Sequence, residues 1–350
     1  MHTNMWVVDN VVDNVVERKK YYPQLQEAAK LLRENEAVAF PTETVYGLGA
    51  NAMDDEAIAK IFEAKGRPSD NPLIVHIGTK SQLDGIVKEI PPVAEKLMAH
   101  FWPGPLTIIL PRKEGISEKV TAGLNTVGVR MPDHPIALAL IEEANVPVAA
   151  PSANRSGRPS PTLASHVYED LNGKIAGIVD GGATGVGVES TVIDCTSAVP
   201  TILRPGGITK EQLEAVIGTV SLDPALKDEK EKPKSPGMKY THYAPKAPLS
   251  IVEGSREFIQ HLVDEKKEEG FKVGVLTTEE YQHVYSADVI LSCGVRSDLA
   301  SVATKLYDVL RTFDASEVDV IFSESFPNEG IGNAIMNRLT KAAGHHIIIE

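Results

Sequence analysis

The side chains best suited to chemistry lie in the stretch 38–76. A short apolar run, Val38–Phe40, leads into a turn rich in hydroxyl groups, and Lys65 and Arg67 follow in a Pro-flanked loop. A lysine acts as a point charge on phosphate, whereas an arginine offers a planar fork for paired contacts. Two cations beside such a turn indicate a site for a polyphosphate and a small polar molecule. Taken alone, Lys-Gly-Arg-Pro is more often a solvated surface loop, because motifs of this length are common.

A second group of polar residues, 151–158, follows a short apolar run. Ligands of α/β proteins commonly bind where strands end, and Ser152 and Asn154 could donate hydrogen bonds there to phosphate or to a metal-bound water. The same residue types also favour helix N-caps for purely local reasons. On this segment alone the two interpretations are equally good.

A glycine-rich segment, 181–191, could expose backbone N–H groups to an anion. It lacks the Lys-Ser/Thr ending of a Walker loop, and its glycine spacing does not match Gly-x-Gly-x-x-Gly. A hairpin loop is therefore a strong alternative. The run Glu189-Ser190-Thr191, directly before an expected strand, is less easily explained in that way.

Single basic residues stand at two further places, Arg130 and Arg204. A lone arginine usually pairs with an internal carboxylate, but a substrate carrying both a carboxylate and phosphates would require several such cations. His76 ends an apolar run and could be a core histidine, a general base or a substrate contact. The sequence has no His-Glu-x-x-His or Cys-x-x-Cys spacing typical of a protein metal site.

Helices and strands are expected to alternate irregularly over the first two thirds of the chain, which predicts a mixed, twisted α/β sheet. Several of the polar residues above then stand at strand ends or in the loops that follow. The apolar patterns place helices at 23–35, 54–65, 92–101 and 135–143, and strands at 37–40, 73–77, 106–110, 127–131, 146–150, 175–179 and 191–194.

The composition changes at 223–248, where a charged, Pro-rich segment indicates a linker. Its end, 238–245, carries two tyrosines, a histidine and a lysine and is not linker-like. The remainder alternates strands and helices as a Rossmann-like α/β domain would. We expect strands at 249–252, 273–277, 289–291 and 318–322, and helices at 256–269, 297–313 and 331–343. The predicted domains are therefore 1–222 and 249–350, joined by 223–248.

The totals are those of a soluble protein large enough for two domains. The net charge of −13 argues against a broad basic surface for nucleic acid, although it leaves room for a local basic pocket. Cys195 and Cys293 are interpreted as two buried thiols in a reducing compartment. No stretch approaches eighteen apolar residues and no signal-peptide pattern is present, so we expect a cytoplasmic protein.

Ten motifs stand in a fixed order along the chain. They are Pro41-Thr-Glu-Thr-Val-Tyr-Gly-Leu48, Lys65-Gly-Arg67, Asn71-Pro-Leu-Ile-Val-His76, Trp102-Pro-Gly-Pro-Leu-Thr107, Val129-Arg-Met-Pro132, Ala150-Pro-Ser-Ala-Asn154, Gly187-Val-Glu-Ser-Thr191, Leu203-Arg-Pro-Gly206, Pro236-Gly-Met-Lys-Tyr-Thr-His-Tyr-Ala-Pro245 and Gly330-Ile-Gly-Asn-Ala-Ile-Met-Asn-Arg338. Together they resemble the YrdC/TsaC family of L-threonylcarbamoyladenylate synthases, in its long form with an appended C-terminal domain. The resemblance implies a YrdC-like twisted mixed sheet with a concave cavity and a smaller Rossmann-like α/β domain.

The resemblance implies a nucleotidyltransferase that condenses L-threonine, bicarbonate or CO2, and ATP into threonylcarbamoyl-AMP and pyrophosphate. A separate transferase complex would then pass the threonylcarbamoyl group to adenosine 37 of tRNAs that read ANN codons. Such a reaction needs no enzyme nucleophile, so catalysis would rest on positioning and on neutralising charge. Mg2+ is expected as a cofactor, held mainly by the ATP phosphates and water.

The family's roles, carried over to the matching positions, imply two sets of binding residues. ATP would be bound by Lys65, Arg67, Asn71, Thr126, Ser152, Asn154, Ser160, Arg204 and Tyr240, and threonine by Thr44, His76, Arg130, Ala150 and Ser190. Lys65 and Arg67 would also be catalytic, and no protein side chain is assigned as a metal ligand. Arg130 would take the amino-acid carboxylate, because a guanidinium fork matches it. Tyr240 would belong to a flap within 223–248 that excludes water from labile intermediates.

Two other functional classes compete with this interpretation. One is an RNA-binding or ribosome-assembly factor, against which the net charge weighs. The other is a carbamoyl-transfer enzyme like the hydrogenase maturation proteins that contain a YrdC-like domain. Those proteins carry acylphosphatase and zinc-finger regions, which this sequence lacks. Direct binding of tRNA, the role of the C-terminal domain and the oligomeric state stay open.

Overall fold

The structure is a computed structural model that describes residues 2–9, 22–226 and 242–350. Tyr240 and the first part of the segment 238–245 lie outside these residues. Contacts between Cα atoms divide the chain into two compact units. The first unit contains Met1–Ser156, Pro161–Gly185 and Glu189–Lys239, and the second contains Gly157–Ser160, Val186–Val188 and Tyr240–Glu350.

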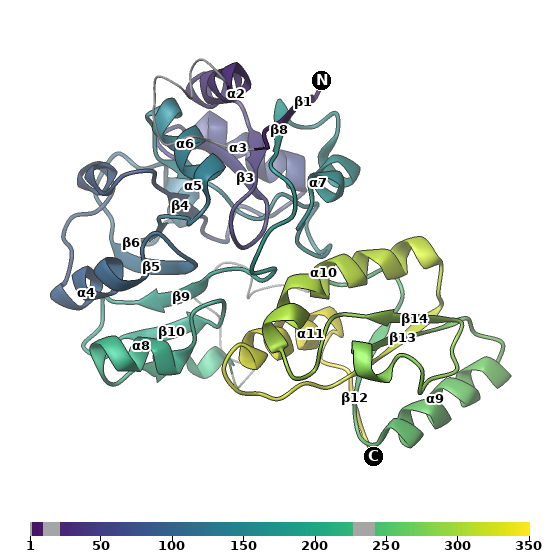
Figure 1. Cartoon of the computed structure of the whole chain (residues 1–350). Helices are drawn as coiled ribbons and strands as arrows, with labels where there is room; N and C mark the ends of the chain where they lie inside the picture. The colour runs from purple at the N-terminus through teal and green to yellow at the C-terminus, as the bar shows by residue number, and fades with distance from the viewer. Residues whose placement is uncertain (1, 10–21, 227–241) are drawn as a thin grey trace. The chain divides into compact units, whose positions relative to one another are not determined.

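A sheet of eleven strands forms the centre of the first unit, counted over the described residues (Figure 1). The strands are β1 (Asn4–Val7), β2 (Val38–Phe40), β3 (Gly47–Asn51), β4 (Ile74–His76), β5 (Leu106–Pro111), β6 (Thr126–Arg130), β7 (Val148–Ala149), β8 (Gly177–Asp180), β9 (Thr191–Asp194), β10 (Thr201–Arg204) and β11 (Ser221–Leu222). Their order is β1-β8-β2-β3-β7-β4-β6-β5-β9-β10-β11.

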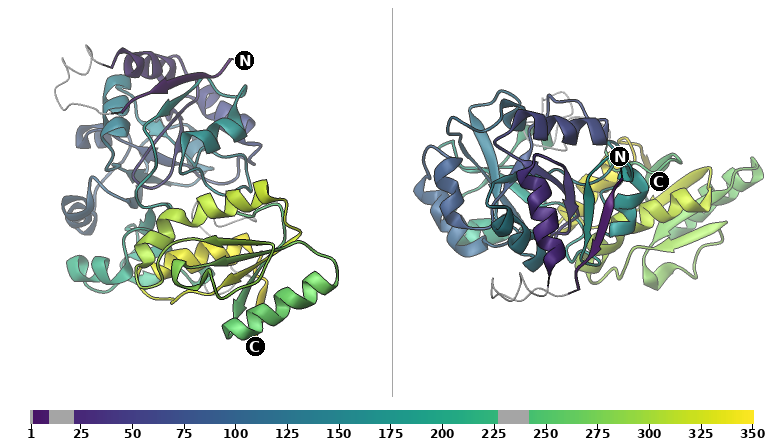
Figure 2. Two further views of the ribbon diagram at one scale, coloured as in Figure 1. Left: turned by 45° about the vertical axis from the view of Figure 1, so that its right-hand side comes forward. Right: turned by 90° about the horizontal axis from the view of Figure 1, so that it is seen from above.

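Parallel and antiparallel pairs alternate in this sheet, so the predicted mixed α/β sheet is confirmed. Strand β2 pairs in parallel with β8 and antiparallel with β3. Strand β1 lies beside β8, where Asn4 faces Gly177 (Figures 1 and 2). Segments far apart in the sequence are therefore neighbours at the edge of the sheet.

Helices cover both faces of this sheet. They are α2 (Pro23–Arg33), α3 (Asp55–Lys65), α4 (Pro92–Phe101), α5 (Glu118–Thr121), α6 (Pro135–Ala144), α7 (Ala164–Leu171) and α8 (Lys210–Ile217), with short 3-10 turns at Lys80–Gly85 and Pro224–Leu226. Side chains of a strand alternate between the two faces. Val38 and Phe40 accordingly pack in one core with α2 and α6, whereas Ala39 packs in the other core with α3.

Helix α3 places Lys65 at the start of the predicted phosphate loop. The Asp54 side chain accepts a hydrogen bond from the Ala57 N–H at 2.8 Å and so caps the helix N-terminus. The helix ends at Gly66, whose φ of 62° lies in the left-handed region that favours glycine. Lys65 is therefore the last residue of the helix, and Arg67 lies in the loop that follows.

Several elements of the first unit were not predicted from the sequence, among them β1, β3, β10, α7 and α8. Strand β3 was missed because glycines at 47 and 49 weaken a strand pattern. The structure gives the reason for Gly49: a Cβ atom there would lie 2.7 Å from the side chains of both Phe40 and Val148. The glycine permits a close approach of neighbouring side chains.

The second unit is built on five parallel strands, which confirms the predicted Rossmann-like α/β domain. The strands are β12 (Leu249–Glu253), β13 (Val273–Thr277), β14 (Val289–Ser292), β15 (Val320–Glu324) and β16 (Ile347–Ile349), in the order β14-β13-β15-β12-β16. The helices are α9 (Arg256–Glu268), α10 (Leu299–Ser316) and α11 (Gly332–Ala342), with a 3-10 turn at Glu279–Tyr281.

Helices of this unit lie on both faces of its sheet. Val273 and Val275 of β13 share a core with Ile259 of α9. Gly274 points the other way, since a Cβ atom there would lie 2.7 Å from the ring of Phe313 in α10. The predicted strand at 318–322 begins and ends two residues later, at Val320–Glu324, so that Glu324 stands at the carboxyl end of the sheet.

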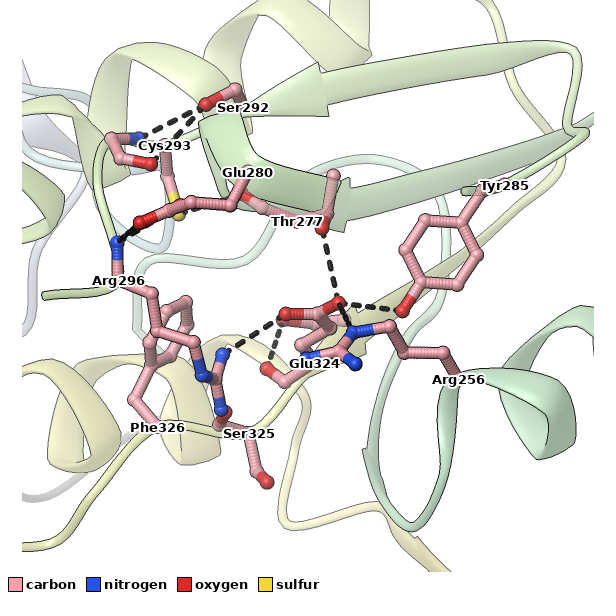
Figure 3. Close-up of polar contacts among 12 residues, drawn as sticks. Arg256, Thr277, Glu280, Tyr285, Ser292, Cys293, Arg296, Glu324, Ser325 and Phe326 are labelled. Carbon is pink, nitrogen blue, oxygen red and sulfur yellow. Dashed lines mark hydrogen bonds and ion pairs between the residues drawn. The ribbon is translucent and has the colours of Figure 1, made fainter. Parts of the chain in front are cut away.

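Glu324 is the centre of a polar cluster at the carboxyl ends of these strands (Figure 3). Its carboxylate accepts hydrogen bonds from the hydroxyls of Thr277 at 3.1 Å and Tyr285 at 2.5 Å, and from Nη1 of Arg296 at 3.0 Å. Nε of Arg256 lies 3.9 Å from the same carboxylate. Because both carboxylate oxygens already have partners within the unit, we interpret the cluster as a stabilising network.

Candidate active site

The hydroxyl-rich turn after β2 is held by its own side chains. The Thr42 hydroxyl donates to the carbonyl of Val45 at 2.7 Å and lies 2.9 Å from the Thr44 hydroxyl. It also accepts hydrogen bonds from the backbone N–H groups of Thr44 and Val45, at 3.2 and 3.3 Å. A threonine that bonds to the backbone two and three residues on stabilises a turn. Thr44 is thereby fixed in a buried position.

Arg130, at the end of β6, reaches this turn. Its Nη1 donates to the Thr44 hydroxyl at 3.0 Å, and its Nε donates to the Gly104 carbonyl at 3.3 Å. Its Nη2 lies 2.6 Å from Oε1 of Glu43, and the two side chains are only 5% and 13% exposed. The guanidinium therefore links the loop before β5, the turn after β2 and a nearly buried carboxylate.

His76 lies beside Arg130, because β4 and β6 pair in parallel with these two residues opposite each other. Burial lowers the pKa of His76 to about 3, and the positive charge of Arg130 lowers it further in the same direction. The ring is therefore neutral at physiological pH. Its Nδ1 lies 3.2 Å from the Ile74 carbonyl, which also accepts the N–H of Ala150 at 2.9 Å.

Ser190 and Arg204 lie in direct contact at another part of the sheet. Nη2 of Arg204 donates to the carbonyl of Ser190 at 2.9 Å and to its hydroxyl at 3.1 Å. The Ser190 hydroxyl also lies 2.8 Å from that of Thr107 in β5. Strand β5 pairs with β6, the strand that ends in Arg130. One residue predicted for ATP thus contacts one predicted for threonine.

Lys65 is buried against the 151–154 turn. Its ammonium donates to the carbonyl of Ser152, to the carbonyl of Asn154 at 2.7 Å and to the side-chain oxygen of Asn154 at 3.4 Å. The sequence predicted these residues in one site, and the structure brings the three together. The contacts favour a role for Lys65 in positioning the turn, and its contact with phosphate stays a prediction.

Arg67 is half-buried in the loop after α3. Its Nη2 donates to the carbonyls of Asn71 and Pro72 at 3.4 and 3.3 Å, which are long hydrogen bonds. Asn71 is only 3% exposed, and its Nδ2 has no hydrogen-bond acceptor among the described residues. The loop therefore presents a guanidinium and a buried amide donor, groups that suit an oxygen-rich anion.

The remaining predicted site residues are placed as follows. Thr126 begins β6 and is half-buried. Ser160 falls by its contacts in the second unit and is fully buried there. Tyr240 lies outside the described residues. The structure thus connects Thr44, His76, Arg130 and Ala150 in one group, while it does not test what any of these residues binds.

Glu43 and Gly104 are features of the site that the sequence reasoning missed. Both lie inside motifs that carried the resemblance, but neither received a role. The signal for Glu43 was its place between Thr42 and Thr44, where a turn holds three polar side chains in a row. A charged residue in a turn is usually solvated, so its burial against Arg130 could not be read from the sequence.

Neither cysteine is suited to nucleophilic catalysis. Burial raises the pKa of Cys195 and of Cys293 to about 12 in each case, so both remain thiols at neutral pH. The prediction of two buried thiols is confirmed. Among residues 2–9, 22–226 and 242–350, no three His, Cys, Asp or Glu side chains are grouped so that they could hold a metal ion.

No helix in the described part of the chain is long and apolar enough to cross a membrane. The candidate site is instead a collection of buried cations, hydroxyls and one carboxylate on a large sheet. Such groups can bind and orient a zwitterion and phosphates, and they can stabilise charge that develops during a reaction.

Two family models match the chain. The model described as telomere recombination matches residues 30–206, and the model described as the C-terminal domain of threonylcarbamoyl-AMP synthase matches residues 208–344. Together they account for most of both units. The first covers every element that carries the buried cations described above.

Curated relatives match over their full length. The threonylcarbamoyl-AMP synthase of Bacillus subtilis is 62% identical over 349 residues, which are 99% of this chain and 100% of the relative. That of Pyrococcus abyssi is 50% identical over 349 residues, covering 98% of this chain and 99% of the relative. A crystal structure of P. abyssi Sua5 complexed with L-threonine matches with a TM-score of 0.92 at 48% identity, covering 99% of this chain and 100% of that one.

Proposed function

Since the chain belongs to the Sua5-type threonylcarbamoyl-AMP synthases, in which a YrdC domain precedes a Sua5 C-terminal domain, we propose that its substrates are L-threonine, bicarbonate or CO2, and ATP. It is an ATP-using nucleotidyltransferase of the pathway to threonylcarbamoyladenosine in tRNA. The observation that carries the proposal is the 62% identity with a synthase over the full length. Identity of this extent favours the enzyme over the RNA-binding alternative.

The reaction proceeds in two bond-forming steps. The neutral amine of threonine attacks the carbon of CO2 and gives a carbamate. A carbamate oxygen then attacks the α-phosphorus of ATP, and pyrophosphate leaves. Positioning of the reactants and neutralisation of the departing negative charge supply the catalysis. Mg2+, held mainly by phosphate oxygens and water, neutralises part of that charge when it is bound.

Threonine binds in the group formed by Thr44, His76, Arg130 and Ala150. Support comes from the contacts that join these residues and from the relative whose crystal structure is a complex with L-threonine. Arg130 receives the carboxylate, because its fork matches a carboxylate in shape and charge. The neutral ring of His76 offers a hydrogen bond without adding a second positive charge beside Arg130.

ATP binds along the loops that carry the other predicted residues. They are Lys65, Arg67, Asn71, Thr126, Ser152, Asn154, Ser160, Arg204 and Tyr240. Support for this set is the buried amide of Asn71 and the exposed side of the Arg67 loop, together with the contact between Arg204 and Ser190 of the threonine set. The product passes to a separate tRNA threonylcarbamoyl transferase complex.

Release of pyrophosphate tests the proposed function. Purified full-length protein is incubated with ATP, L-threonine and bicarbonate, and pyrophosphate is measured with a coupled assay. We expect release that depends on both threonine and bicarbonate. Release that is independent of threonine, or none at all, would contradict the proposal. Salt-sensitive RNA binding in a filter assay without ATP turnover would support the RNA-binding alternative instead.

A further inference from the structure

Glu43 holds a buried carboxylate whose contacts are unusual. Both oxygens are buried, and neither accepts a hydrogen bond from the described residues. Its charge partner is Nη2 of Arg130 at 2.6 Å, a contact not aligned as a hydrogen bond. A buried carboxylate normally accepts several hydrogen bonds, because the loss of water is costly. The arrangement therefore suits a further cationic donor at Glu43.

The neighbours of Glu43 hold it in place but do not supply that donor. Its backbone carbonyl accepts the N–H of Gly185 at 3.1 Å. Arg130 uses its Nη1 on Thr44 and its Nε on Gly104, so only Nη2 faces the carboxylate. A carboxylate fixed by its backbone beside a fixed guanidinium is arranged in advance for a ligand.

The other titratable groups around Glu43 come from two elements. His134 precedes α6, and burial lowers its pKa while the charges of Glu43 and Asp133 act in the opposite direction. His76, on β4 beside Arg130, has its pKa lowered to about 3. Both imidazoles are therefore biased towards the neutral form. Arg130 is the cation that faces Glu43 on the page of contacts described for the first unit.

We propose that Glu43 receives the α-ammonium of the amino-acid substrate and takes a proton from it as the carbamate forms. The inference rests on the proposed function, which places the carboxylate of threonine on Arg130. An α-amino acid carries opposite charges on neighbouring groups, so an arginine and a glutamate side by side match both ends of the zwitterion. Glu43 is then a catalytic residue that contacts the nitrogen that reacts.

The proton balance of the step is as follows. Threonine enters as an ammonium ion, and one N–H bond breaks: its electron pair stays on nitrogen and its proton passes to Glu43. The nitrogen lone pair then forms a bond to the carbon of CO2, while one C=O π pair moves onto oxygen. A second proton leaves the nitrogen to solvent, and the carbamate remains. No atom is oxidised or reduced.

Glu43→Gln in the full-length protein tests the inference, since glutamine keeps the size but cannot take a proton. At neutral pH we expect kcat to fall by about 10²–10⁴-fold, while ATP affinity measured by calorimetry stays unchanged. The ratio of wild-type to variant kcat/KM for threonine should then shrink as the pH rises, because the free amine supplies itself. The bicarbonate equilibrium is the same for both proteins and cancels in the ratio.

Two further variants separate catalysis from folding and from general charge effects. Glu43→Asp retains a carboxylate and should recover part of the activity lost in Glu43→Gln. Asp133→Asn removes an exposed carboxylate close to the same histidine and should leave activity unchanged. If Glu43→Gln fails to fold in a thermal melt, the pH dependence of Glu43→Asp against wild type supplies the same comparison.

Three results would overturn the inference. Wild-type activity in Glu43→Gln would show that the carboxylate is not needed. A raised KM with unchanged kcat and a ratio independent of pH would show that Glu43 only positions Arg130. Absence of threonine-dependent pyrophosphate release in the wild type would instead remove the proposed function itself, which distinguishes the two failures.

Discussion

Arg130 contacts three separate parts of the first unit through one guanidinium. Nε and Nη1 donate to Gly104 and Thr44, and Nη2 pairs with Glu43. Removing the whole side chain would leave the Glu43 charge buried without a counter-ion, which typically costs about 3–5 kcal/mol. A substitution that keeps the charge is therefore the more informative one.

Arg130→Lys should weaken threonine binding by about 10–100-fold and leave ATP binding unchanged. The ammonium can pair with Glu43, but it lacks the planar fork for a carboxylate, and each charge-assisted hydrogen bond lost is worth about 1.5–3 kcal/mol. Isothermal titration calorimetry with each substrate measures the effect. Unchanged threonine affinity would contradict the assignment of the carboxylate to Arg130.

Arg67→Ala should have the opposite selectivity, with weaker ATP binding and unchanged threonine binding. Its hydrogen bonds to Asn71 and Pro72 are long, so we expect little loss of stability. The matched control is Lys60→Ala, which removes a cation from the preceding helix that pairs with Glu36. Equal loss of both ligands in Arg67→Ala would argue against separate sites.

His76 should make the stability of the protein depend on pH. Its folded-state pKa of about 3 lies below the usual value of 6.5, so the unfolded chain binds more protons at acidic pH. The stabilisation is complete above about pH 6.5 and is lost as the pH falls towards 3, by up to about 1.4 kcal/mol per pH unit. Urea unfolding at pH 7, 6 and 5 should show a shallower slope in His76→Gln. Parallel slopes in the two proteins would contradict the prediction.

At the scale of elements, the sequence was informative where one residue pattern decides the structure. Helix α4 was predicted with its observed bounds, and α9 ended one residue earlier than expected, because their apolar spacing is regular. Strands β3 and β10 were missed. The first contains two glycines, and the second was interpreted only as a loop that carries Arg204.

The candidate site was predictable to the extent that it lies at strand ends. His76 and Arg130 end adjacent strands, as the patterns indicated, and Lys65 ends a helix. The pairing of strands from distant parts of the sequence, which brings Arg130 to Thr44, needed the resemblance or the structure. Glu43 shows the remaining limit, because burial of a charged turn residue depends on the whole fold.

Gly206 fixes how the loop after β10 passes the segment before β9. A Cβ atom there would lie 2.3–2.4 Å from backbone atoms of residues 189–191, which cannot rotate away as a side chain can. Gly206→Ala should therefore displace Ser190, destabilise the protein by about 1–3 kcal/mol and weaken threonine binding. Chemical unfolding and calorimetry measure the two effects.

Gly85→Ala is the control for this prediction. A Cβ atom at Gly85 would meet nothing within 4 Å, so the same substitution is made in open space. It should leave both stability and threonine binding close to those of the wild type. Equal effects of the two substitutions would show that close packing at Gly206 is not the cause.

At the scale of the whole molecule, the chain has separate hydrophobic cores in its two units. One pair of cores lies on the two faces of the eleven-stranded sheet, and another core joins α9 to the five-stranded sheet. Proteins built in this way often unfold in more than one transition. A substitution that acts within one unit can therefore be assigned to its own transition.

Glu324→Ala should destabilise the second unit by about 3–5 kcal/mol, because it leaves the charge of Arg296 without its main partner and the Tyr285 hydroxyl without its acceptor (Figure 3). Burial and the Glu324 charge also raise the pKa of Tyr285 well above its usual range, so that the phenol stays protonated as a donor. Differential scanning calorimetry should show one transition moved to lower temperature.

Glu269→Ala provides the comparison that makes this result interpretable. Glu269 pairs with Lys266 at 2.6 Å on the surface of the same unit, where both side chains are substantially exposed. Surface pairs of this kind contribute about 0–1 kcal/mol, so the transition should hardly move. A shift of every transition by Glu324→Ala would mean that the two units unfold together, whereas a shift no larger than that of Glu269→Ala would mean that the buried cluster contributes nothing net to the stability of its unit.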